Sequence, residues 1–148
     1  MPAAAGEARP ETSEKKVLRV SAGILTRNGR FFAGCRASGH SMAGKWEFPG
    51  GKIEENETPE ECIVREIREE LHVPARVTAK LCVLTHDYDS FTIELHVFMM
   101  TETSSAEPYS LEHRDFGFRT LEEILSLPWD PCDIRIMPFL KEWISAQG

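Results

Sequence analysis

The segment Thr58–Leu71 carries the most complete set of local structural signals in the chain, and it constrains the fold more than any other stretch. Thr58 is followed by Pro59 and, three residues on, by Glu61, a pattern typical of a capping box with proline at the first helical position. Pro74 should end the helix, because proline cannot continue one. The apolar residues recur every four positions and form one stripe: Ile63, Ile67 and Leu71. The sequence therefore predicts an amphipathic helix with one buried face.

Strand patterns lie on both sides of this helix. The predicted strands cover residues 17–25, 31–36, 46–48, 76–86, 91–100 and 114–119. Turns are expected at residues 28–29, which are Asn-Gly, and at residues 89–90. Residues 49–51, which are Pro-Gly-Gly, should end the short third strand.

Two further helices are expected near the end of the chain. A second capping box, Thr120 with Glu123, should start a short helix. Asp130 and Pro131 should start the last helix, and Pro138 should kink or break it. Because helices and strands do not alternate regularly, we expect an α+β fold with a mixed sheet flanked by helices.

Length and composition are typical of one globular domain. The chain has 148 residues, which predicts a single domain over residues 16–148. Residues 1–15 lack periodicity and should form a mobile tail. No apolar run is long enough to span a membrane, and the N-terminus lacks the apolar core of a secretory signal. Four cysteines without a C-x-x-C pair indicate a reducing cytoplasm.

The negative charge is concentrated in one stretch. The chain has a net charge of −7, and residues 54–70 hold eight glutamates against Arg65 and Arg68. Such a cluster disfavours nucleic acid as a partner, since binding it requires a basic surface. Glu69 and Glu70 lie three and four positions after Glu66, so on a helix they repel Glu66 unless a divalent cation offsets the repulsion. The alternative is a solvated charged face that the two arginines compensate in part.

The residues before and within this helix resemble the box of the Nudix family. Gly51 is followed after five residues by Glu57 and after seven more by Arg-Glu-Ile-Arg-Glu-Glu at residues 65–70. The approach to the box, Trp-Glu-Phe-Pro-Gly-Gly at residues 46–51, is similar to that of the MutT branch. The resemblance implies an α/β/α sandwich around a mixed sheet. It also implies Mg²⁺-dependent hydrolysis of a nucleoside diphosphate linked to another group, with Mn²⁺ as a substitute.

The resemblance also implies roles for individual residues. The metal ligands would be the Gly50 carbonyl and four carboxylates: Glu66, Glu69, Glu70 and Glu112. The catalytic set would be Glu66, Glu69, Arg65 and Glu112, with Arg65 paired to Glu57. Glu69 or another carboxylate would be the general base. Glu112 lies outside the box, and an ordinary surface glutamate is the alternative for it.

Four residues are expected to bind substrate: Arg36, Lys52, Tyr88 and Asp133. The alternatives are solvated charges for Arg36 and Lys52 and a core position for Tyr88. Asp133 resembles the base-reading residue of the CTP/methyl-dCTP pyrophosphohydrolase subgroup, and an ionised carboxylate would accept from the N4 amino group of cytosine.

The substrate classes can therefore be ranked. The favoured substrate is (d)CTP or a modified dCTP, cleaved to the monophosphate and pyrophosphate. An 8-oxo-dGTP diphosphatase that sanitises the nucleotide pool is the first alternative, and a non-catalytic nucleotide-binding module is the second. We expect a monomer or homodimer that binds neither nucleic acid nor membrane.

The histidines are not spaced like metal ligands, and one of them replaces a residue of the Nudix box. His72 stands where the Nudix box has glycine, at a helix end where a left-handed residue is expected. The remaining histidines are scattered, and we expect surface or strand positions for them: His40, His86, His96 and His113.

Overall fold

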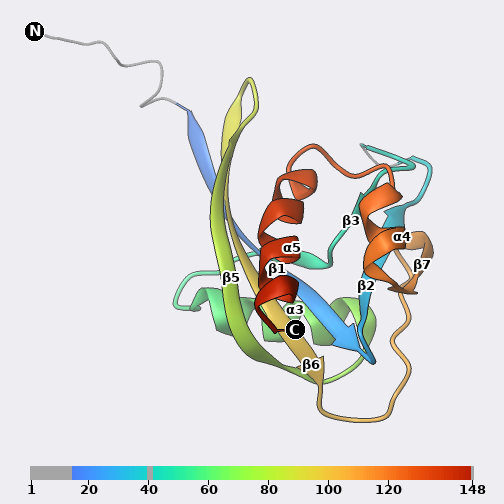
Figure 1. The fold of residues 1–148 in the computed structure, drawn as a ribbon. Coiled ribbons are helices and arrows are strands. Elements are labelled where there is room, and N and C mark those ends of the chain that lie inside the picture. Colours follow the sequence, from blue (N-terminus) through green and yellow to red (C-terminus); the bar gives the residue numbers. More distant parts are fainter. Residues whose placement is uncertain (1–14, 40–41, 148) are drawn as a thin grey trace, which may run out of the picture.

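The computed structural model describes residues 15–39 and 42–147 (Figure 1). Residues 1–14 of the predicted tail and His40 lie outside this part. The strands are β1 Lys16–Arg27, β2 Arg30–Arg36, β3 Trp46–Glu47, β4 Gly50–Lys52, β5 Ala75–Asp87, β6 Phe91–Glu102 and β7 His113–Arg119. The helices are α3 Pro59–Leu71, α4 Leu121–Ser126, the 3₁₀ helix η1 Asp133–Ile136 and α5 Met137–Gln147. No helix of this described part is long and apolar enough to cross a membrane.

The seven strands form one mixed sheet. Its main path runs β3-β2-β1-β6-β5, with β4 paired to β1 and β7 paired to β2. β1 and β6 are parallel, and the other pairs are antiparallel. β1 pairs with β2 only at Thr26 and Arg27, and with β4 at residues 20–22. The sheet therefore separates between β1 and β2, and β4 enters the opening.

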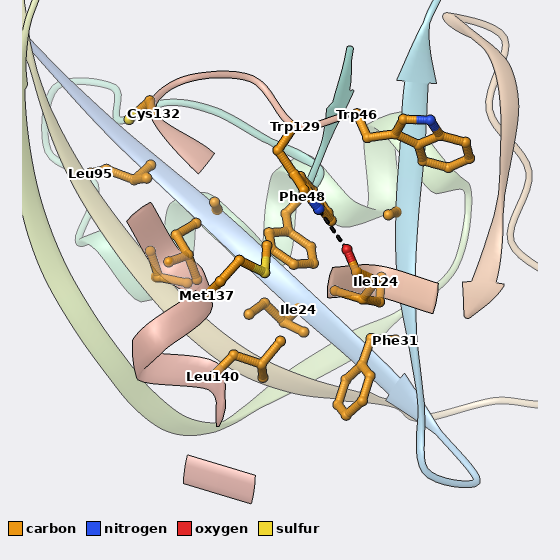
Figure 2. Packing of buried hydrophobic residues seen from close by; sticks show 14 of the residues in the cluster. Ile24, Phe31, Trp46, Phe48, Leu95, Ile124, Trp129, Cys132, Met137 and Leu140 are labelled. Carbon is orange, nitrogen blue, oxygen red and sulfur yellow. Dashed lines mark hydrogen bonds between the residues drawn. The ribbon is translucent and has the colours of Figure 1, made fainter. Parts of the chain in front are cut away.

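Helices cover both faces of the sheet, which confirms the predicted sandwich. α3 lies on one face, and α4 and α5 lie on the other (Figure 1). Ile63, Ile67 and Leu71 of α3 are fully buried against the first face, as the stripe predicts. On the opposite face Ile124 and Leu140 belong to one core cluster with Ile24 of β1 (Figure 2). Burial of each large apolar side chain contributes roughly 1.5–3 kcal/mol, so both layers hold the sheet in place.

The local signals for α3 and for the first hairpin are confirmed. Thr58 Oγ1 accepts from the Glu61 amide at 3.1 Å, and Glu61 Oε1 accepts from the Thr58 amide at 2.9 Å. Asn28 and Gly29 have φ values of 52° and 75°, which a primed hairpin turn requires. These elements therefore follow directly from neighbouring residues.

One prediction about the backbone was incomplete, and one was wrong. The third strand ends before Pro49, as predicted, but Gly50 and Gly51 also form a further strand, β4. A Cβ at Gly50 would collide with the Ser21 carbonyl oxygen, so only glycine allows this approach to β1. The last helix begins at Met137, after the 3₁₀ turn. Pro138 thus occupies its first turn, where a missing amide hydrogen costs little, and neither kinks nor breaks it.

His72 ends α3 in the left-handed conformation, as predicted, with φ 64° and ψ 30°. Its ring also stacks on Tyr109, with centroids 4.2 Å apart. Glycine would relieve a strain of about 1 kcal/mol but lose a ring contact of about 0.5–1.5 kcal/mol. We expect His72→Gly to leave the free energy of unfolding nearly unchanged and His72→Ala to lower it. Urea unfolding of both variants checks this, and a clearly more stable His72→Gly would mean that the stacking contributes little.

Candidate active site

A cavity of about 510 Å³ opens where the sheet separates. Its walls come from β1, β4, the β5–β6 hairpin and the segment before η1. All four residues predicted to bind substrate line it: Arg36, Lys52, Tyr88 and Asp133. Gly50 lines it as well. The topology therefore brings together residues that are far apart in the sequence.

Arg65 ties the loop before α3 to the helix. Its Nε donates to Glu57 Oε2 at 2.6 Å and its Nη2 to Glu57 Oε1 at 3.0 Å, the predicted pair. Nη2 also donates to the Lys52 carbonyl at 3.2 Å. The guanidinium lowers the pKa of the Glu57 carboxyl to about 2. The loop is thus held by a bidentate, charge-assisted contact.

The three helix carboxylates occupy different surroundings. Glu66 accepts from Arg65 Nη1 at 3.0 Å and is largely buried. Glu69 accepts from the same nitrogen at 3.1 Å, but 60% of its side chain is exposed. Glu70 is 10% exposed and accepts from the Gly50 amide at 3.2 Å. α3 therefore presents one deeply buried carboxylate beside β4 and two that Arg65 holds.

The Glu70 carboxyl is buried among other negative charges. Its pKa is raised to about 8, chiefly by burial and then by the charges of Glu47 and Glu112. The hydrogen bond from the Gly50 amide lowers the pKa by less than either charge raises it. Glu112, predicted from a distant loop, therefore lies near enough to act on Glu70. Carboxylates held together in this way fit a divalent cation, which prefers several oxygen ligands.

Glu47 and His113 are site residues that the sequence reasoning missed. Each offers, with Glu70, a ligand atom within 4.8 Å of the others, so the three could hold a metal ion. His113 is a strand residue, as expected, but its side chain is only 2% exposed. Glu47 belongs to the Glu-Phe-Pro-Gly-Gly segment, which was the available signal. The partnership with His113 depends on pairing of β2 with both β3 and β7.

Arg36 is held by carboxylates rather than solvated. Its Nε and Nη2 donate to Glu47 Oε1 at 2.9 and 2.6 Å. Its Nη1 lies 3.3 Å from Asp130 Oδ2. Although burial opposes it, this pairing raises the Arg36 pKa. Burial also opposes ionisation of Glu47, but its hydrogen bonds with His113 and Arg36 keep its pKa below the ordinary value. Arg36 thus presents a fixed guanidinium to the cavity.

Asp133 lines the cavity, and its charge acts on Tyr88 of the β5–β6 hairpin. Its Oδ2 accepts from the Phe48 amide at 2.8 Å. Burial raises the Asp133 pKa to about 8, and the nearby Asp130 and Glu47 charges act in the same direction. Tyr88 stacks on Phe91 with centroids 4.8 Å apart. The site therefore offers an aromatic wall beside a carboxyl that is neutral at pH 7.

Gly51 provides a test of the packing under Glu66. A Cβ at this position would lie 2.3 Å from the Glu66 carboxyl. Gly51→Ala should therefore displace that carboxyl and lower kcat at least about tenfold, since misplacement by 1 Å can cost about 10²-fold. Steady-state kinetics and thermal unfolding measure the two effects separately. Loss of stability without loss of kcat would exclude a functional role for the Glu66 position.

Known proteins share this architecture and sequence. Residues 17–140 match the model of the NUDIX domain. The CTP pyrophosphohydrolase of Escherichia coli K12 is 31% identical over 122 residues, 82% of this chain and 90% of that protein. The 8-oxo-dGTP diphosphatase of Proteus vulgaris is 38% identical over 90 residues, 60% of this chain and 80% of that protein.

A solved structure agrees with the sequence matches. The solution structure of the E. coli ORF135 protein superposes with a TM-score of 0.78 at 29% identity, covering 90% of this chain and 95% of that one. The domain match spans most of the chain, including the acidic helix and the cavity-lining residues up to Asp133. The chain therefore belongs to the NUDIX family, as a MutT-like hydrolase.

Proposed function

We propose that the protein hydrolyses a nucleoside triphosphate, ribo or deoxyribo, to the monophosphate and pyrophosphate, with Mg²⁺ and with Mn²⁺ as a substitute. The observation that carries the proposal is the buried Glu70 carboxyl, which lies near the charges of Glu47 and Glu112 and accepts from Gly50, a residue that lines the cavity. A bound divalent cation would neutralise phosphate charge and make water a better nucleophile.

The chain's own residues would position the reactants. The Gly50 carbonyl and Glu66, Glu69, Glu70 and Glu112 would hold the metal. Lys52 and Arg36, which line the cavity, would face phosphate, and the Arg65–Glu57 pair would keep the loop and helix in register. Glu69 is the candidate general base, because it is the most exposed of the three helix carboxylates. Phosphoryl transfer depends chiefly on such positioning and charge neutralisation.

For the base we propose cytosine, natural or modified. A neutral Asp133 carries both a donor and an acceptor. It could donate to N3 of cytosine and accept from the N4 amino group, while Tyr88 provides a surface for stacking. The likeness to a CTP pyrophosphohydrolase supports this substrate.

Oxidised guanine is the second candidate. The raised pKa of Asp133 removes the reason to expect an ionised carboxylate at neutral pH. A neutral carboxyl could also donate to O6 and accept from N1–H of 8-oxoguanine. The likeness to an 8-oxo-dGTP diphosphatase supports this alternative. The protein would then sanitise the nucleotide pool, and in either case we expect a cytoplasmic monomer or homodimer that does not act on nucleic acid.

The test is pyrophosphate release from a panel of nucleotides. CTP, dCTP, 5-methyl-dCTP, dGTP and 8-oxo-dGTP should be compared at equal Mg²⁺, with kcat/KM determined for each. The highest value for a cytosine nucleotide would support the first candidate, and the highest for 8-oxo-dGTP would replace it. Absence of hydrolysis across the whole panel would contradict the proposed function.

A further inference from the structure

A chain of side-chain hydrogen bonds joins the loop that carries Glu112 to the cavity. Ser110 Oγ lies 2.7 Å from His113 Nδ1, and His113 Nε2 lies 2.9 Å from Glu47 Oε2. Glu47 Oε1 in turn accepts from Arg36. We propose that His113 is a positioning residue that fixes the Glu112 loop and the Glu47 carboxylate relative to Glu70.

The donors in this chain converge on the Glu47 carboxylate from both ends. Arg36 can only donate, so Glu47 is the acceptor of its bonds and, as a carboxylate, also accepts from His113. His113 Nε2 therefore carries a proton, and Nδ1 shares a hydrogen bond with the Ser110 hydroxyl. Ser110 Oγ itself accepts from the Glu112 amide at 3.2 Å. An imidazole suits this place because it has hydrogen-bonding nitrogens on opposite sides of one rigid ring.

The proton on Nε2 argues against His113 as a metal ligand. A nitrogen that carries a proton has no lone pair for a metal, and Nε2 is the atom that lies 3.9 Å from Glu70 Oε2. His113 is near the carboxylates and could reach a metal only by giving up its bond to Glu47. The hydrogen-bonded chain therefore favours orientation of the acidic groups over direct coordination.

The surrounding backbone is built around this ring. A Cβ at Gly34 of β2 would lie 2.7 Å from His113 Cγ and Cδ2. The pairing of β2 with β7 also shifts register between Cys35 and Arg36, opposite His113. Because only glycine leaves room for the ring, the position of His113 is imposed by the sheet rather than by the loop.

The loop has few other means of holding Glu112. Residues 103–112 contain no helix or strand, and both Leu111 and Glu112 are exposed. The Tyr109 amide donates to the Leu71 carbonyl at 3.1 Å, which anchors the loop before Ser110. From Ser110 onward, the Ser110 hydroxyl bonds both His113 Nδ1 and the Glu112 amide, and so links the Glu112 backbone to the His113 ring. Loss of that link should let the Glu112 carboxylate move away from Glu70.

The experiment compares Ser110→Ala, His113→Gln and Gly34→Ala with the control Thr26→Ala. Thr26 Oγ1 donates to the Met100 carbonyl at 3.2 Å, outside the cavity, so its loss reports on stability alone. This inference rests on the proposed metal role of Glu70 and Glu112. We would therefore measure kcat, nucleotide KM and melting temperature. In the absence of nucleotide, electron paramagnetic resonance would measure the affinity for Mn²⁺ and any coupling of the bound Mn²⁺ to ¹⁴N.

We expect the three site variants to lose about 10–100-fold in kcat or in Mn²⁺ affinity, the range usual for residues that orient metal ligands. KM should change little, and Ser110→Ala and Thr26→Ala should lower the melting temperature by similar amounts. A fourth site variant, His113→Ala, is measured beside them. His113→Gln keeps a donor for Glu47 and should be less impaired than His113→Ala.

Two outcomes would overturn the inference, and a third would instead contradict the proposed function. Normal kcat and Mn²⁺ affinity in Ser110→Ala and Gly34→Ala would mean that the link does not position the site. A ¹⁴N coupling in the unmutated protein that disappears in His113→Gln would make His113 a ligand instead. Normal Mn²⁺ binding by Glu70→Gln would contradict the proposed metal site, whatever the His113 variants do.

Discussion

Replacing Glu70 by glutamine should lower kcat by several orders of magnitude and leave the fold intact. The new side chain would keep an oxygen for the Gly50 amide, which now donates to Glu70 at 3.2 Å. It would also carry no charge to desolvate, whereas burial raises the pKa of the Glu70 carboxyl to about 8. The amide would, however, be a poor ligand for a hard divalent cation, which prefers carboxylate oxygens. Steady-state kinetics and urea unfolding measure the two consequences separately.

The matched control is Glu60→Gln, on the same helix. Glu60 is exposed in the first turn of α3 and lies outside the cavity. This variant should retain kcat, and chelation with EDTA should abolish the activity of both the control and the unmutated protein until Mg²⁺ or Mn²⁺ is restored. Near-normal activity of Glu70→Gln, or activity that survives chelation, would exclude the proposed metal site.

The parts of the fold that could be predicted are those with local signals. α3 follows from Thr58, Glu61 and an apolar stripe, and its bounds match the structure. The first hairpin follows from residues 28–29, which adopt the expected left-handed conformations. Interactions between residues a few positions apart determine these elements, so the local sequence is sufficient to predict them.

The parts that could not be predicted depend on contacts across the sheet. Gly50 belongs to β4 because of its approach to Ser21, which is 29 positions earlier in the sequence. Glu47 and His113 meet only because β3 and β7 both pair with β2. Spacing along the chain indicates which carboxylates share a helix face. It gives no information about which buried histidine will orient them.

The ionisation state of a buried side chain could not be predicted from the sequence either. The sequence gives Asp133 as an acid with an ordinary pKa of about 4, and an ionised group was the basis for favouring cytosine. Its place between Phe48 and two other carboxylates reverses that expectation, because burial and the charges of Asp130 and Glu47 raise its pKa to about 8. The tertiary environment, rather than residue type, therefore decides what this side chain offers a base.

Asp133→Leu should lower kcat/KM about 100-fold, and Asp133→Asn should preserve it at pH 7. Leucine leaves the base edge and the Phe48 amide, which now donates to Asp133, without a partner, and each such loss costs about 1–3 kcal/mol. Asparagine keeps one donor and one acceptor, as the neutral carboxyl does. Above pH 8 Asp133 ionises and stops donating, so its contribution to kcat/KM should fall in the unmutated protein but not in Asp133→Asn.

The free energy of unfolding should also depend on the ionisation of Asp133, and this contribution should fall as pH rises. Because the Asp133 pKa is raised to about 8 in the folded state, the unfolded chain ionises first as pH rises from about 4. The stabilisation from neutral Asp133 is therefore complete below pH ~4 and is lost as pH rises to about 8. Asp133→Asn should remove this loss, and exposed Glu142→Gln on α5 should not. Urea unfolding at pH 5 and pH 8 tests this prediction. If the free energy of unfolding depended on pH equally in Asp133→Asn and in the unmutated protein, Asp133 would be ionised at neutral pH. It would then act toward the base as an acceptor alone.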